Sequence, residues 1–232
     1  MQLTLRKAYL GLPKGDLQDS CAKALRGAET QFDFEGRSLW SDSSCGRFSG
    51  VMLRPTEILD FVSSGRLDAG FVSRDLFEER ILNGFDGKSV NVLADLMSSK
   101  LFLQPVQWVL AVPTGNAAKT LPQLRVRDAP LTIATEIPAI VTEWASKNGL
   151  IVATEKSIGS TEAKAPRFVD AIVDCRHSGQ SLKENGLQEI EVVYESTIIF
   201  VTNTQVKDYD ETVREDIRQL ALKMTKFIKS LI

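Results

Sequence analysis

Short apolar runs alternate with stretches of helical spacing along the chain. The runs predict strands over residues 8–12, 50–53, 68–72, 108–112, 131–134, 150–153, 168–173 and 191–201. The clearest helix closes the chain, where Val213, Ile217, Leu220, Met224, Phe227 and Leu231 keep a spacing of three or four. Strands that alternate with helices predict an α/β fold with mostly parallel sheets and flanking helices.

Polar residues before the apolar helical stretches give the expected helix starts. Asp16, Thr56 and Thr135 are the expected N-caps of three of these helices. Gly65 and Gly149 stand where the second and third of them should end. Each of the three helices is therefore expected to begin at a side-chain cap, and the second and third are expected to end at a glycine.

The distribution of proline and polar residues suggests two lobes. Residues 113–130 form a polar, proline-bearing stretch that resembles a boundary, and the amphipathic last helix needs a sheet to dock on. We expect a discontinuous first lobe of residues 1–110 and 190–232, with an inserted second lobe of residues 111–189. Ligands of such folds bind at the carboxyl ends of the strands.

The composition narrows the possible functions. The chain has 232 residues, 43% of them hydrophobic, and a net charge of −2, which is typical of a globular protein and gives no reason to expect nucleic-acid binding. Its one histidine, His177, excludes metal sites built on two or three histidines. We expect no secretion signal, no transmembrane helix and no membrane partner. The widely spaced Cys21, Cys45 and Cys175 favour a reduced, cytoplasmic location over a disulfide framework.

The most informative stretch, DAIVDCRHSGQSL, covers residues 170–182. An apolar strand leads into Asp174, then into a small polar loop around Gly179, then into the expected start of a helix. Backbone N–H groups and serine hydroxyls of such a loop can hold a phosphate, and Asp174 can bind sugar hydroxyls or assist a hydrated Mg²⁺. The alternative is a strand-to-helix turn whose serines only cap the helix.

This stretch and several shorter ones resemble the ATP phosphoribosyltransferase family, which catalyses the first step of histidine biosynthesis. The family pattern D-A-I-V-D-x-x-x-T-G-x-T-L-x-x-N-G-L reads DAIVDCRHSGQSLKENGL over residues 170–187, with serine in place of both threonines. The other stretches that resemble family patterns are residues 12–15 (L-P-K-G), 54–75 (R-x-x-D-I with spaced glycines and acids), 134–138 (A-T-x-x-P) and 159–162 (G-S-V-E). The likeness spans about residues 8 to 203 and resembles the short form of the family, which lacks the C-terminal regulatory domain.

The resemblance implies a transfer reaction between two substrates. N1 of ATP attacks C1 of phosphoribosyl pyrophosphate, and pyrophosphate leaves with Mg²⁺, the expected cofactor. The implied catalytic residues are Asp174, Lys14 and Arg54, of which the two cations serve the pyrophosphate. The implied substrate-binding residues are Gly15, Glu162, Asp170, Arg176, His177, Ser178, Gly179, Gln180 and Ser181. No protein metal ligand is assigned.

Each of the two cations also has a purely structural interpretation. Lys14 can be a solvated loop lysine, and Arg54 can form an ion pair with Glu57 or Asp75. The resemblance further implies a homo-oligomer, with a regulatory subunit resembling histidyl-tRNA synthetase as a further partner.

Several positions depart from the family pattern toward neutral or negative side chains. They are Asp16, Ser73, Glu136, Ile137, Thr142 and Glu143. Each cation lost near a bound phosphate costs on the order of 1–3 kcal/mol. Either other cations compensate, the candidates being Arg37, Arg47, Arg74, Arg167 and Arg176, or the chain is a specialised paralogue with a changed substrate or slow turnover. The alternative function from another class is a non-catalytic, two-lobed protein of the periplasmic-binding type that closes on a small ligand.

Overall fold

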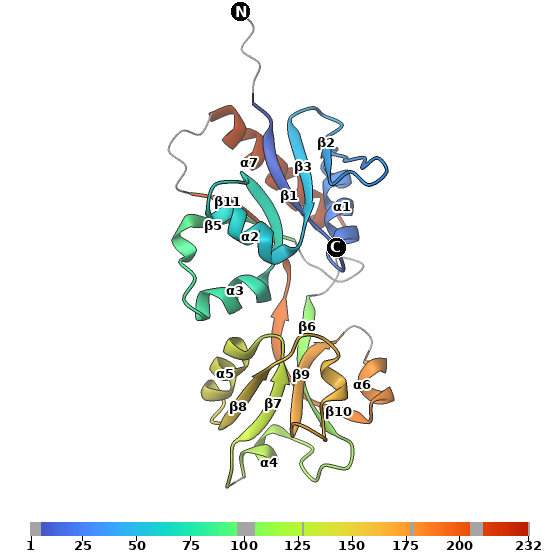
Figure 1. Ribbon diagram of the computed structural model, residues 1–232, viewed down its shortest axis with the longest axis vertical. Coiled ribbons are helices and arrows are strands. Elements are labelled where there is room, and N and C mark those ends of the chain that lie inside the picture. The colour runs from blue at the N-terminus through green and yellow to red at the C-terminus, as the bar shows by residue number, and fades with distance from the viewer. Residues whose placement is uncertain (1–5, 97–104, 127, 177–178, 205–210, 232) are drawn as a thin grey trace, which may run out of the picture. The chain divides into compact units, whose positions relative to one another are not determined.

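The computed structural model describes residues 6–96, 105–126, 128–176, 179–204 and 211–231. Its contacts divide the chain into two compact units. Unit 1 comprises Met1–Phe77, Phe85–Pro105 and Thr197–Ile232, and unit 2 comprises Glu78–Gly84 and Val106–Ser196. Each unit contains one sheet (Figure 1). Within the described ranges, no helix is both long and apolar enough to cross a membrane.

Unit 1 is built on a six-stranded sheet. Its strands, in spatial order, are β2 (Trp40–Asp42), β3 (Phe48–Leu53), β1 (Ala8–Pro13), β4 (Ala69–Ser73), β11 (Ile198–Asn203) and β5 (Val90–Leu96). Strand β1 pairs in parallel with β3 and β4, and the other neighbours pair antiparallel.

Helices cover both faces of this sheet (Figure 1). Helices α1 (Gln18–Gly27) and α7 (Glu211–Lys229) bury their apolar sides against one face. Helix α2 (Pro55–Ser63) packs on the other face, where Ile58 reaches Gly11 and Gly70 so closely that a Cβ at either glycine would lie within 2.7 Å of it. The short helix η1 (Gly87–Ser89) precedes β5, and α3 (Arg74–Leu82) crosses the division between the units.

Unit 2 is built on a five-stranded sheet. Its strands, in spatial order, are β10 (Leu187–Ser196), β6 (Val106–Pro113), β9 (Ala171–Arg176), β7 (Leu131–Thr135) and β8 (Val152–Lys156). Strand β7 is parallel to β8 and β9, whereas β6 runs antiparallel to β9 and β10. Helices α4 (Leu121–Arg125) and α5 (Pro138–Lys147) pack on one face. Helix α6 (Gln180–Glu184) packs on the other face, and the short helix η2 (Thr161–Ala163) follows β8.

The predicted fold class is confirmed, but the sheets are mixed rather than mostly parallel. Strands β2 and β6 run antiparallel to their neighbours β3 and β9, and a further part of the error lies in residues 191–201, which were expected to form one strand. They belong to two antiparallel strands, β10 and β11, which end and begin on either side of Thr197 and belong to different units. Only the short polar stretch of Glu195, Ser196 and Thr197 interrupts the apolar residues there, and three residues are too few to indicate a boundary between two cores.

Three of the expected helix caps are also wrong by one or more residues. The N-caps are Leu17, Arg54 and Ile137 rather than Asp16, Thr56 and Thr135. Proline supplies the first helical position of α2 and α5, where its fixed backbone dihedral suits the first turn. The proline therefore decided these starts, and the neighbouring threonines did not.

Candidate functional site

Two acids meet where β7 and β9 end in unit 2. The strands are parallel, and Thr135 pairs with Val173, so the residues that follow them, Glu136 and Asp174, come next to each other. Asp174 is half-buried, and the Cys175 N–H donates a hydrogen bond to its Oδ1 at 2.8 Å. The carboxyl edge of this sheet thus brings two acids together, and Lys156 at the end of β8 donates from Nζ to the Glu136 carbonyl there.

A third acid, Glu162, reaches this edge from η2. The Ser181 hydroxyl at the start of α6 donates a hydrogen bond to Glu162 Oε1. This bond lowers the pKa of Glu162, and a hydrogen bond with Asp174 adds to the effect. Burial, and then the negative charges of Glu162 and Glu136, raise the pKa of Asp174 to about 6, against the opposing hydrogen bond from Cys175. The interaction between the two acids thus favours the protonated form of Asp174 and the ionised form of Glu162.

Gly179 begins the turn into α6 in a left-handed conformation, with φ +73°. A Cβ added there would meet only Arg176 Cδ, at 4.0 Å, so the backbone conformation and not crowding requires glycine. Gly179 stands two residues before Ser181, whose hydroxyl donates to Glu162. His177 and Ser178, also predicted to bind substrate, lie outside the described residues.

Two predicted loop residues have intramolecular partners. Arg176 Nη1 donates to both carboxylate oxygens of Glu189, at 2.8 and 2.9 Å, and its Nη2 donates to Gln107. Gln180 Nε2 donates to Glu184 Oε1 at 2.7 Å. Glu189 neutralises the charge of Arg176. Arg176 is therefore a poor replacement for the cations that the family pattern has and this chain lacks.

Asp170 lies at the opposite end of β9 from Asp174. The two acids are four positions apart along an extended strand, which places their backbones about 13 Å apart. Asp170 Oδ2 accepts hydrogen bonds from the N–H and the hydroxyl of Thr132, at 3.0 and 2.9 Å, and its own N–H donates to that hydroxyl at 2.9 Å. The structure thus separates Asp170 from the candidate site and gives it a part in joining β7 to β9.

Unit 1 carries its predicted cations on two neighbouring strand ends. Lys14 follows β1 and Arg54 follows β3, and the Lys14 N–H donates to the Leu53 carbonyl at 2.8 Å. Both side chains are exposed. The backbone N–H of Arg54 donates to Glu57 Oε2 at 3.2 Å, so this contact with Glu57 involves the main chain of Arg54 and not its guanidinium group. Gly15 continues from Lys14 with φ +87° and open space around it.

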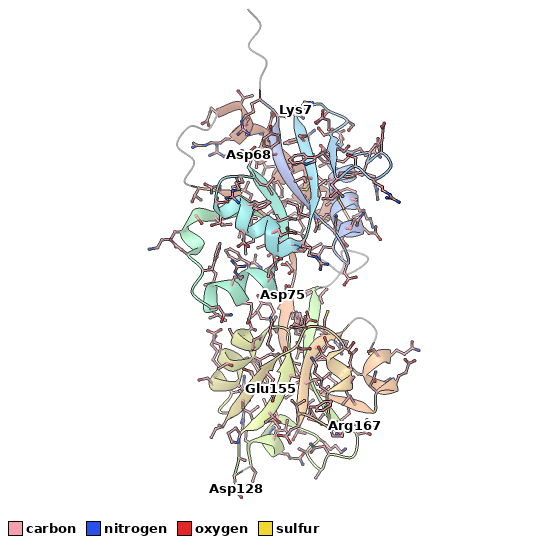
Figure 2. The ribbon with its side chains drawn as sticks, in the orientation of Figure 1. Lys7, Asp68, Asp75, Asp128, Glu155 and Arg167 are labelled. Atoms are coloured by element: carbon pink, nitrogen blue, oxygen red, sulfur yellow. The ribbon has the colours of Figure 1, made fainter. Side chains whose placement is uncertain are left out.

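The other arginines considered as compensating cations are distributed over both units. Arg47 pairs with Asp216 at 3.1 Å and Arg74 with Asp95 at 2.7 Å, while Arg37 is exposed. Figure 2 shows Arg167 toward the end of unit 2 where Asp128 lies, ahead of the starts of β7 and β9. Arg167 is therefore remote from Asp174 within unit 2.

The sequence did not predict the hydrogen bonds among the polar side chains next to Glu162. Ser157 and Thr161 are each 1% exposed, their hydroxyls lie 2.8 Å apart, and Lys164 Nζ donates to Ser157 Oγ. A polar stretch such as SIGSTEAK gives no periodic signal for burial, so only its hydrogen bonds in the fold distinguish these residues from ordinary loop residues.

Solved structures of several proteins share this fold. The chain superposes on the SsuA aliphatic sulphonate-binding protein of Escherichia coli with a TM-score of 0.59, at 13% identity, over 97% of this chain and 73% of that one. It superposes on a chain of the ATP phosphoribosyl transferase (HisG:HisZ) complex from Thermotoga maritima with a TM-score of 0.70, at 22% identity, over 96% of this chain and 99% of that one. The fold is thus that of the class of two-sheet α/β proteins that includes periplasmic binding proteins.

Sequence comparison specifies the family within this class. The family model described as ATP phosphoribosyltransferase matches residues 54–226. The ATP phosphoribosyltransferase of Chlorobium phaeovibrioides is 35% identical over 219 residues, which cover 94% of this chain and 71% of the relative. That of Chlorobium luteolum is 35% identical over 213 residues, covering 92% and 69%. The chain belongs to the ATP phosphoribosyltransferase family.

Proposed function

We propose that this chain transfers the 5-phosphoribosyl group of phosphoribosyl pyrophosphate to N1 of ATP, the first step of histidine biosynthesis. In this reaction the N1–C1 bond forms, the bond from C1 to the pyrophosphate oxygen breaks, and pyrophosphate leaves with that electron pair. The family supplies the identity of the two substrates. The observation that supports the chemistry is the edge of unit 2 where Asp174, Glu162 and Ser181 are joined by hydrogen bonds beside the left-handed Gly179.

This edge offers complementary groups to a phosphorylated sugar. Carboxylates accept hydrogen bonds from ribose hydroxyls, and the turn at Gly179 can present backbone N–H groups to the 5-phosphate. Positive charge develops on the ribose as pyrophosphate departs, and fixed carboxylates stabilise it without reorganisation. No covalent nucleophile is needed, so positioning and electrostatics provide the catalysis.

The role of Mg²⁺ in the proposal is that of a companion to the substrate. Among the residues that the structure describes, no three acid, histidine or cysteine side chains form a group that holds a metal. Mg²⁺ usually keeps several waters and binds through substrate phosphates, so we assign it to the pyrophosphate and not to a protein site. When bound there, it neutralises charge on the leaving group.

Lys14 and Arg54 of unit 1 are proposed to bind the pyrophosphate. Both are exposed cations on adjacent strand ends, and ammonium and guanidinium groups are strong donors to phosphate. Lys7 offers a matched control, because it precedes the same strand and pairs with Asp42 at 2.5 Å (Figure 2). We expect Lys14→Met to raise the KM for phosphoribosyl pyrophosphate about fivefold, and Lys7→Met to leave it within twofold. Equal effects of the two variants would argue against a pyrophosphate role for Lys14.

The experiment that tests the function is product identification by mass. The chain is incubated with phosphoribosyl pyrophosphate, Mg²⁺ and, separately, ATP, ADP, GTP or AMP, and released pyrophosphate is measured in parallel. The expected result is a phosphoribosyl adduct of ATP and an equal amount of pyrophosphate. An adduct with another nucleotide would show a changed acceptor. Binding of phosphoribosyl pyrophosphate with no adduct would favour the non-catalytic binding protein.

The proposal extends to the oligomeric state, the regulatory partner and the cellular location of the chain. We infer a homo-oligomer with a HisZ-like regulatory subunit, supported by the likeness to the chain in the HisG:HisZ complex. Sedimentation of the chain alone at micromolar concentration is expected to show a species larger than a monomer. We also infer a cytoplasmic location, supported by the free thiols of Cys21, Cys45 and Cys175, since disulfides are rare there.

A further inference from the structure

A lysine and two buried hydroxyls form a polar cluster beneath the Glu162 segment. Ser157 and Thr161 are almost fully buried, and their hydroxyl oxygens lie 2.8 Å apart. The half-buried Lys164 donates from Nζ to Ser157 Oγ. An ammonium group loses hydration when it is partly buried, which costs free energy. The hydrogen bond to the Ser157 hydroxyl offsets part of that cost.

The cluster joins the segment to the sheet. The Ser157 N–H donates to the Thr135 carbonyl at 2.7 Å, at the end of β7. Between Ser157 and Thr161 the chain makes a tight turn, with Gly159 at φ +94° and Ser160 at φ +47°. Ser160 is a non-glycine residue in the left-handed region, a conformation that persists only where surrounding contacts enforce it. The hydrogen bonds around Ser157 are contacts of that kind.

Glu162 is held between two members of the cluster. Thr161 precedes it directly, and Lys164 follows two residues later with its N–H donating to the Thr161 carbonyl at 3.1 Å. Both neighbours are tied through their side chains to Ser157, one by the 2.8 Å contact and one by the ammonium group. The backbone of Glu162 therefore has little freedom, and its carboxylate is fixed where Ser181 donates to it.

We propose that Lys164 is a positioning residue for the phosphoribosyl-binding edge of unit 2: by holding Ser157 and Thr161, it fixes Glu162 opposite Ser181 and Asp174. The inference rests on the proposed function for the identity of the ligand. Lys164 acts through Ser157 and not by contact with the substrate. The groups that lower the pKa of Glu162 are Ser181, a backbone N–H and Asp174, which is consistent with a role of Lys164 in placement rather than charge.

The first measurement is independent of activity. Amide hydrogen exchange is followed in residues 157–163 of the full chain, in the parent, in Lys164→Met and in Lys147→Met. Lys147 is a control in the same unit, since it is exposed and pairs with Glu143 at 2.9 Å on α5. We expect at least fivefold faster exchange of this segment in Lys164→Met and no change in Lys147→Met. Unchanged exchange in Lys164→Met would overturn the proposal.

The second measurement concerns the ligand. Calorimetry with ribose 5-phosphate is expected to show about fivefold weaker binding to Lys164→Met, and kinetics about tenfold lower kcat/KM for phosphoribosyl pyrophosphate with the KM for ATP within twofold. Lys164→Arg, which keeps a charged donor, should restore both to within threefold. A merely structural role would lower the yield of folded protein without this split between the two substrates. Faster exchange with unchanged ribose 5-phosphate binding, or a loss that arginine does not restore, would reject positioning.

A second variant keeps the inference testable if Lys164→Met does not fold. Ser157→Ala removes the acceptor of the same hydrogen bond, so it should reproduce the exchange and binding changes. The double variant should be no worse than Ser157→Ala alone, because that change already removes the acceptor of the Lys164 hydrogen bond together with the contact to Thr161. Additive losses would contradict the link. A parent chain that neither binds ribose 5-phosphate nor forms product would overturn the proposed function. The exchange data would then still test whether Lys164 restrains residues 157–163.

Discussion

The two ends of β9 carry acids of the same type in opposite situations. At the amino end, Asp170 accepts two hydrogen bonds from Thr132 and joins neighbouring strands. At the carboxyl end, Asp174 accepts one from its neighbour Cys175 and lies against Glu162 and Glu136. The first acid is satisfied by donors, while burial and the two neighbouring carboxylates raise the pKa of the second. In an α/β sheet, ligands bind at the carboxyl edge, and the less satisfied acid is the one found there.

The largest expected effect is on activity and separates the two acids. Asp174→Asn removes a charged acceptor for the sugar and should lower kcat/KM for phosphoribosyl pyrophosphate about thirtyfold. Asp170→Asn keeps an oxygen that can accept from Thr132 and should change it by less than about twofold. Initial rates of pyrophosphate release for the two variants and the parent provide the measurement. Similar losses in both variants would show that position along β9 does not distinguish the acids.

The second comparison uses two glycines with the same backbone requirement. Gly179 lies at the carboxyl edge with φ +73°, and Gly149 lies ahead of β8 at the amino edge with φ +64° and open space around it. Valine at either position strains the backbone by about 1–3 kcal/mol. We expect Gly179→Val to lower turnover at least tenfold, because it alone alters the proposed phosphate loop. Gly149→Val should lose comparable stability and little activity.

Urea denaturation alongside the rates tests this pairing. If both valine variants lose activity in proportion to their stability, the turn at Gly179 has no special role in phosphate binding. Gly179→Asn sharpens the result, since asparagine tolerates the left-handed region better than valine and should retain more activity. The expected order of turnover is parent, asparagine variant, valine variant.

These contrasts mark how far the sequence alone predicts this site. The pattern of residues 170–182 predicted both a strand and a polar loop, and the structure has β9 followed by the left-handed Gly179. It singled out Asp174 as the acid that follows the strand, but the family resemblance still assigned Asp170 to substrate binding. The hydrogen bonds of Asp170 with Thr132 depend on the pairing of β7 with β9, which the sequence does not give. The role of Lys164 was missed because a hydrogen bond to a buried serine depends on a tight turn that composition does not reveal.

The fold shows a similar division between what was and was not predictable. Amphipathic spacing predicted α7 from Val213 onward, and the structure buries Val213, Ile217, Leu220 and Met224 on one side of it. The prediction is wrong at the last turn, where Phe227 is only partly buried, Leu231 is exposed beyond the end of the helix, and Ile228 is buried instead. Helix α3 was not predicted, because its apolar residues do not gather on one side. Strand β2 has only three residues, too few for an alternating pattern to be recognised.

A smaller effect is expected at the amino end of β9. Asp170→Ala removes the oxygen that accepts both hydrogen bonds from Thr132 and leaves a half-buried N–H and hydroxyl without that acceptor, which should lower the free energy of unfolding by about 1–1.5 kcal/mol. Urea denaturation at pH 7 measures it, and Thr132→Val should cost a similar amount. The double variant should lose less than the sum of the two, because the residues share the same bonds. A full sum would mean that Asp170 stabilises β9 by some other contact.

The smallest expected effect concerns the free energy of unfolding, which ionisation of Asp174 lowers, whereas ionisation of a carboxylate in a folded protein usually raises it. The pKa of Asp174 is raised from the ordinary 3.8 to about 6, so between these pH values the folded chain binds more protons at this residue than the unfolded chain. The ionised Asp174 is therefore destabilising above pH 6. Asp174→Asn, which is neutral at every pH, should raise the free energy of unfolding at pH 8 by about 1 kcal/mol, a figure reduced for the partial exposure of the side chain. The gain should fall as the pH drops from 6 and vanish below 3.8, whereas Asp170→Asn should show no such gain. Urea denaturation of the three chains from pH 3.5 to pH 8 measures the difference, and an Asp174→Asn variant less stable than the parent at pH 8 would contradict the argument that like charge lies beside this acid.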